Sequence, residues 1–125
     1  MLDAFLERMA ATPFVDGKAD CVMTVADWVV RNGYPDPAAP YRGRYHYALG
    51  RERIIRREGG LLALMSAGAA RSGLSETVSP GRGAVGLVDL RDVPLAAICV
   101  GNRWAFQAQG GLLVDRAEII TAWGV

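Results

Sequence analysis

The chain has 125 residues, of which 51% are hydrophobic and 22% are charged, and its formal net charge is +1. This length predicts a single domain over residues 1–125 with a sizeable core, and the composition excludes a disordered chain. The near-neutral charge gives no reason to expect a nucleic-acid or membrane-surface partner. No apolar stretch approaches the ~18 residues of a membrane helix, and the first residues lack the basic leader of a signal peptide.

The first half of the chain carries apolar residues at helical spacing. Thr12-Pro13 ends the first predicted helix, and Asp20 is the expected N-cap of the second. Asn32-Gly33 closes the second helix, and Gly59-Gly60 separates the last two. The predicted helices cover residues 2–10, 21–32, 47–58 and 61–71.

The second half changes to short apolar runs punctuated by Gly, Pro and Asn, which is typical of strands. Gly101-Asn102 is a hairpin signal between two of these runs. The predicted strands cover residues 84–90, 94–101 and 103–109, then a short run after Gly110-Gly111 and a last run ending near Trp123. Helices followed by antiparallel strands predict an α+β protein in which N-terminal helices pack on a C-terminal sheet.

Two cysteines, Cys21 and Cys99, do not make a disulfide framework. The only histidine, His46, lies near neither of them in the sequence, so we expect no metal site and no cofactor. Cys99 falls within a predicted strand and is expected in the core. Cys21 falls in the first turn of a helix, where the helix dipole favours a thiolate and lowers the thiol pKa. A helix of this kind packed on a sheet is the layout of papain-like hydrolases.

The segment around Cys21 resembles the signature of the NlpC/P60 superfamily, and the whole chain resembles a short, phage-associated branch of it. The residues that carry the resemblance are Thr12-Pro13-Phe14, Gly17, Asp20-Cys21, Asp27-Trp28, Tyr41–Tyr45, Gly59-Gly60, Pro80-Gly81 and Ala122-Trp123. These segments, in this order and with this spacing, extend over nearly the full chain. The resemblance implies an NlpC/P60-like domain with a papain-like fold.

The resemblance also implies a catalytic set, in which Cys21 occupies the position of the nucleophile. Leu95 falls where active relatives keep the base histidine, and Gln107 falls where a third polar residue orients that base. Arg82 stands in place of the carboxylate that usually follows the Pro-Gly turn. General-base assistance is worth ~10²–10⁴-fold in rate, so a thiol without its base is expected to be a poor nucleophile.

The residues leave alternatives open at these positions. Cys21 is either a buried core residue and catalytic relic, a working nucleophile, or a redox or acyl-carrying thiol. His46 either folds back to serve Cys21 as its base or is a loop or interface residue. Six arginines lie between Arg42 and Arg57 among three tyrosines. They could bind nucleic acid, but the balanced charge favours a solvated face or a protein contact.

The resemblance implies a tail-tip component of a phage or a phage-derived particle, assembled in the host cytoplasm and located in the virion. It would be a catalytically inactive assembly or plug module, with other tail proteins such as the hub and the distal tail protein as partners. The alternative is a Cys21-dependent peptidase or amidase that acts on peptidoglycan.

Overall fold

The computed structural model describes residues 1–125 and places four helices before all the strands. The predicted helices are confirmed, and their bounds differ from the sequence expectation by only one residue at an end. They are α1 (Leu2–Ala11), α2 (Cys21–Arg31), α3 (Ala48–Glu58) and α4 (Leu61–Ser72). Gly59 and Gly60, with φ of 95° and 115°, produce the sharp break between the last two helices.

The strands form one antiparallel sheet in the order β1-β6-β2-β3-β4-β5. They are β1 (Glu76–Thr77), β2 (Val85–Leu90), β3 (Val93–Cys99), β4 (Trp104–Ala108), β5 (Gly111–Asp115) and β6 (Glu118–Trp123). The five longer strands match the sequence prediction. The two-residue β1 was not predicted, since two residues carry no hydrophobic pattern. The α+β class, with N-terminal helices packed on a C-terminal antiparallel sheet, is therefore confirmed.

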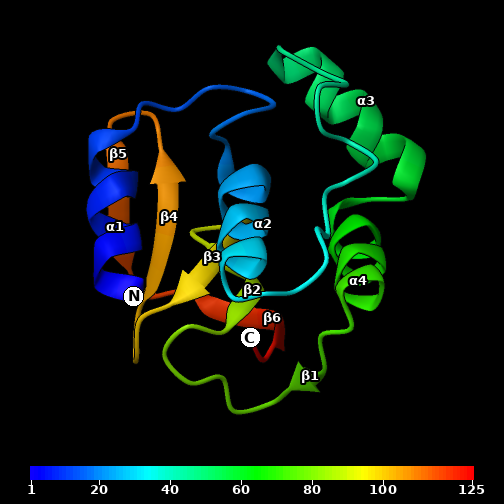
Figure 1. Ribbon diagram of the computed structural model, residues 1–125. Helices are drawn as coiled ribbons and strands as arrows, with labels where there is room; N and C mark the ends of the chain where they lie inside the picture. Colours follow the sequence, from blue (N-terminus) through cyan, green and yellow to red (C-terminus); the bar gives the residue numbers. More distant parts are fainter.

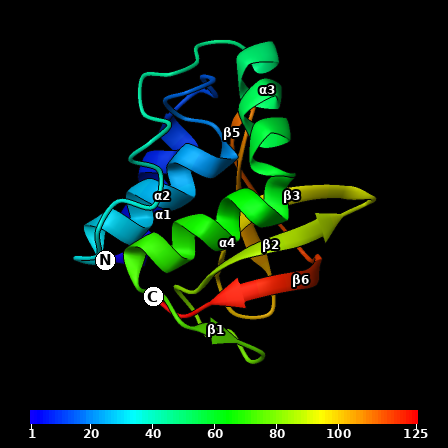
Figure 2. The same cartoon turned by 90° about the vertical axis from the view of Figure 1, so that its right-hand side faces the viewer.

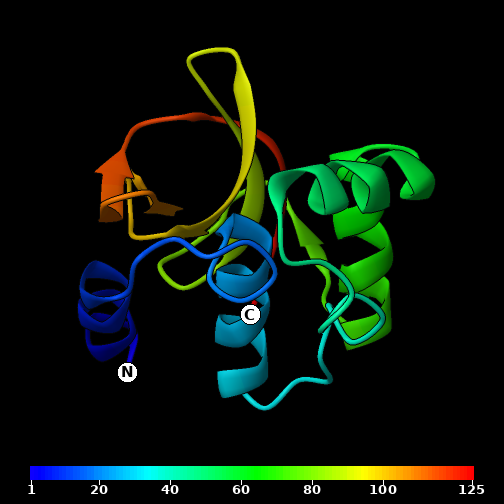
Figure 3. The same ribbon diagram turned by 90° about the horizontal axis from the view of Figure 1, so that it is seen from above.

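The helices lie on one side of the sheet (Figures 1 and 3). In Figure 1, α1 and α2 stand side by side with β4 behind the space between them, and α4 lies on the other side of α2. Figure 2 shows α3 rising away from the sheet and the hairpin of β2 and β3 projecting to the side. Helix α3 has no fully buried residue, whereas α2 buries six of its residues.

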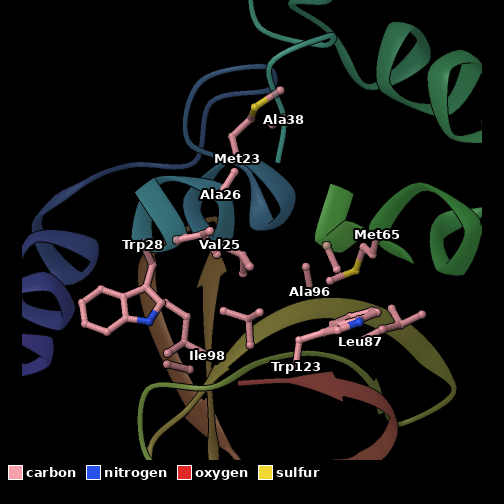
Figure 4. Packing of buried hydrophobic residues seen from close by; sticks show 14 of the residues in the cluster. Met23, Val25, Ala26, Trp28, Ala38, Met65, Leu87, Ala96, Ile98 and Trp123 are labelled. Carbon is pink, nitrogen blue, oxygen red and sulfur yellow. The ribbon is translucent and has the colours of Figure 1, made fainter. Parts of the chain in front are cut away.

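The main core fills the space between the helices and the near face of the sheet (Figure 4). Helix α2 contributes Val25 and Trp28, and the sheet contributes Ala96 and Ile98 from β3. Met23 belongs to the same cluster but points away from the sheet, towards Ala38. A second, smaller cluster covers the far face of the sheet. Its members include Val88, Ala97, Cys99, Trp104 and Phe106, with Leu95 packed against them.

The two clusters follow from the alternation of side chains along a strand. On β3, Ala96 and Ile98 face the helices, whereas Leu95, Ala97 and Cys99 face away from them. Cys99 is buried, as predicted for a core residue. This alternation decides which residue of β3 meets the N-terminus of α2.

Candidate functional site

Cys21 is the first residue of α2, and its thiol lies against the backbone of Ala96 on β3. The helix begins here because Asp20 is its N-cap, as predicted. Oδ1 of Asp20 accepts a hydrogen bond of 2.8 Å from the backbone N–H of Met23, which is otherwise without a partner in the first turn. The site therefore consists of a half-buried cysteine at a capped helix terminus, whose thiol faces the sheet.

The Asp20 carboxylate is fully buried and holds two loops onto the start of α2. Its Oδ2 accepts a hydrogen bond from the Gly17 N–H at 2.9 Å and one from the Tyr45 hydroxyl at 2.5 Å. Gly17 has a φ of +82° and lies against the Tyr45 carbonyl, so a larger residue would collide there. The carboxylate therefore joins the loop before α2 to the loop that precedes α3.

Arg51 is the nearest cation to this site. Its guanidinium forms an ion pair with Asp16 and lies 5.7 Å from the ring centroid of Phe14. The positive charge of Arg51 is therefore already paired with a carboxylate of the loop before α2. Arg51 stabilises that loop and contributes a modest positive potential near the Cys21 thiol.

The electrostatics at Cys21 differ from the sequence expectation. Burial raises the pKa of the Cys21 thiol above its ordinary value, and the charge of Asp20 adds to this effect. The backbone of Ala96 and the guanidinium of Arg51 lower the pKa, but they do not offset the burial. We expected the helix N-terminus to favour the thiolate, and the structure instead favours the neutral thiol.

The structure corrects the residue that faces Cys21 from the sheet. We expected Leu95 to occupy the position of a base, but Leu95 packs in the cluster on the far face. Ala96 is the residue of β3 that lies beside the thiol, and it is 1% exposed. A one-residue shift along a strand reverses the face of every side chain, which explains the difference. Whether Leu95 or Ala96 is taken as the position of the base, the residue there is apolar and cannot accept a proton.

Gln107 lies on the face of the sheet that meets the helices and is 5% exposed. Its Nε2 donates to the Thr12 carbonyl at 2.8 Å and, at 3.5 Å, to the Gly111 carbonyl. Its Oε1 accepts a long hydrogen bond of 3.5 Å from the hydroxyl of Thr24. None of these bonds reaches Cys21, so Gln107 connects the end of α1 to α2 and β4.

His46 is exposed and forms no hydrogen bond or ion pair, so nothing in the structure brings its imidazole to Cys21. Its neighbour Tyr45 is the residue that reaches the site. Burial, followed by the hydrogen bond to Asp20, raises the pKa of the Tyr45 hydroxyl above its ordinary value. Tyr45 is thus a neutral hydrogen-bond donor and not a base.

Sequence reasoning did not assign Tyr45 to the site. The only signal was the general one that aromatic residues in a proline-rich loop need a surface on which to pack.

The six arginines between Arg42 and Arg57 fall into two groups, paired and unpaired, which the sequence could not reveal. Arg42 pairs with Asp27 and Asp36, and Arg51 pairs with Asp16, while the other four arginines are exposed and form no ion pair.

The fold and the site define a small α+β domain with a neutral cysteine at the start of a helix that packs on an antiparallel sheet. The chain belongs to the family described as Domain of unknown function (DUF6950), whose model matches residues 1–125. No curated protein and no solved structure matches the chain. None of its helices has the length and apolar character needed to cross a bilayer.

Proposed function

We propose that this chain is an NlpC/P60-like domain of the phage-associated type that acts as a structural module of a tail tip and not as a hydrolase. The proposal rests on the resemblance in sequence together with the state of Cys21. A papain-like arrangement is part of it, because a cysteine at the start of a helix faces an antiparallel sheet that follows later in the chain.

The observation that carries the proposal is the apolar surface opposite the Cys21 thiol. The nearest residue of β3 is Ala96, and the only histidine is exposed and makes no polar contact. A thiol with a raised pKa and no adjacent base is a weak nucleophile at neutral pH. The scaffold around the cysteine nevertheless remains well built, because the fully buried Asp20 carboxylate has three hydrogen-bond donors.

The surface of α3 is the part of the molecule that favours a role in assembly. Arg53, Arg56 and Arg57 are exposed and unpaired, and the preceding Tyr47 and Leu49 are 77% and 62% exposed. Arginine and tyrosine are enriched in protein interfaces because they combine apolar contact with hydrogen bonding. We assign this surface to contact with a neighbouring tail protein such as the hub or the distal tail protein.

The test is co-purification of the full chain with the hub and distal tail proteins of a phage tail. We expect a stable complex that is lost when Arg56 and Arg57 are both changed to Glu. Changing Arg103 and Arg116 both to Glu is the matched control, because the two residues are exposed and unpaired but lie between β3 and β4 and between β5 and β6. A monodisperse monomer that binds neither tail protein would contradict the proposal.

The second candidate is a Cys21-dependent peptidase or amidase acting on peptidoglycan. One observation favours it: Cys21 lies at the N-terminus of α2 and its thiol faces the sheet. Peptidoglycan is incubated with the wild-type chain, with Cys21→Ala and with His46→Ala, and released fragments are measured by mass spectrometry. Release that requires Cys21 would establish the enzyme, whereas equal release or none in all three samples would reject it.

A further inference from the structure

A cleft of about 470 Å³ runs between α1 and α2. Figure 1 shows the two helices side by side, with β4 behind them. The cleft is lined by side chains of α1, α2, β4 and the loop between the helices, and Cys21 is not among them. This volume falls within the range of roughly 300–1,000 Å³ that is typical of small-ligand sites.

The floor of the cleft holds two polar side chains, Thr24 and Gln107, which are 6% and 5% exposed. The hydroxyl of Thr24 and Oε1 of Gln107 are 3.5 Å apart, whereas a strong hydrogen bond of this kind spans about 2.7–2.8 Å. Oε1 of Gln107 has no other donor in the structure. The 3.5 Å contact is the one polar partner of these two atoms, so a ligand that brings a donor for the carbonyl and an acceptor for the hydroxyl can replace it with shorter bonds.

The rim of the cleft is cationic. Arg8, Lys18 and Arg31 line it, and none of them forms an ion pair. The one carboxylate on the rim, Asp27, is bound to Arg42 at 2.8 Å. These three cations come from α1, from the loop before α2 and from the end of α2, where the Arg31 guanidinium lies 5.7 Å from the centroid of the Phe5 ring. Positive charge is therefore spread along the cleft and not concentrated at one point.

We propose that the cleft between α1 and α2 binds a short, extended peptide segment with acidic side chains. A backbone N–H of the peptide would donate to Oε1 of Gln107, and a backbone carbonyl would accept from the Thr24 hydroxyl. Its carboxylates would pair with the free cations of the rim, which form the stronger, charge-assisted bonds. This inference uses neither Cys21 nor α3, and it does not depend on the tail-tip role proposed above.

Two capped tripeptides test the proposal by NMR titration of the isotope-labelled chain. The probes are acetyl-Glu-Ala-Glu-amide and its uncharged isostere acetyl-Gln-Ala-Gln-amide. We expect saturable shifts with the Glu peptide at the amides of Lys18 and Thr24 and at the side-chain amide of Gln107. The Gln peptide is expected to bind at least about tenfold more weakly, because it lacks the charge-assisted bonds.

Three single variants distinguish binding in the cleft from non-specific attraction of the acidic peptide to the positive charges of the protein. Arg8→Gln and Thr24→Val are each expected to weaken binding of the Glu peptide several-fold. Arg103→Gln removes the same charge from the loop between β3 and β4, away from the cleft, and is expected to leave the affinity unchanged. The retained dispersion of the spectrum reports that each variant is folded. Absence of saturable shifts in the cleft, equal affinity for the two peptides, or an equal loss in Arg103→Gln would overturn the proposal.

Discussion

The hydroxyl of Tyr45 donates a hydrogen bond of 2.5 Å to Oδ2 of Asp20, the residue that caps the helix bearing Cys21. The two residues are 25 positions apart and both are buried. This contact fixes the loop before α3 over the N-terminus of α2. The start of α2 is therefore enclosed by a neutral tyrosine and a capping carboxylate, in place of an acid–base pair.

Changing Tyr45 to Phe is expected to lower the free energy of unfolding by about 2 kcal/mol, because a buried carboxylate loses one of its donors. Urea denaturation followed by circular dichroism measures the change. Tyr47→Phe is the matched control, since Tyr47 is 77% exposed and its hydroxyl has no partner. Equal stabilities of the two variants would show that the Tyr45 hydroxyl contributes nothing.

The same contact predicts how stability depends on alkaline pH. The folded state raises the pKa of Tyr45 above its unfolded value of about 10. The resulting stabilisation is fully present below pH ~10 and is lost as the pH rises through the folded-state pKa. Above pH ~10, the wild type should lose stability more steeply than Tyr45→Phe, by about 1.4 kcal/mol per pH unit. Parallel pH profiles of the two proteins would contradict this account.

Gly17→Ala is expected to destabilise the protein by at least about 3 kcal/mol or to prevent folding. A Cβ at this position would lie 2.0 Å from the Tyr45 carbonyl oxygen, and its φ is +82°. Gly33→Ala is the control, because Gly33 has a φ of +91° but no atom within 4 Å of the added Cβ. It should cost only the backbone strain of about 1–2 kcal/mol. A similar loss in both variants would exclude the close contact as the cause.

A histidine introduced at Leu95 should leave the reactivity of Cys21 unchanged. Leu95 packs on the far face of the sheet, so its imidazole would point away from α2. Iodoacetamide alkylation of Cys21 at neutral pH, measured by peptide mass spectrometry, compares Leu95→His with the wild type. A strongly accelerated reaction in Leu95→His would mean that this position faces the cysteine after all.

Most of the fold follows from local patterns in the sequence. The stripe that includes Val25 and Trp28 predicted α2, Asp20 predicted its first turn, and paired glycines predicted the break between α3 and α4. The short apolar runs predicted all the strands except β1. These features depend on neighbouring residues, which is why the sequence alone was sufficient for them.

The site was less predictable because it depends on contacts between distant residues. Leu95 and Ala96 are both apolar, so no alternation of polar and apolar residues fixed which of them faces the helices. The bond between Tyr45 and Asp20 joins two loops, and loops carry no periodic signal. Burial at Cys21 also depends on tertiary packing, and it reversed the direction of the pKa shift that the helix terminus alone would give.

The most direct test of the account is the alkylation rate of Cys21 in the native protein as a function of pH, with the urea-unfolded chain as reference. We expect a rate well below that of the unfolded chain at neutral pH. It should rise only at alkaline pH, because burial raises the pKa of the thiol. Rapid alkylation with a titration midpoint below pH ~7 would reveal an activated thiolate. That result would contradict the claim that Cys21 has lost the role of a nucleophile.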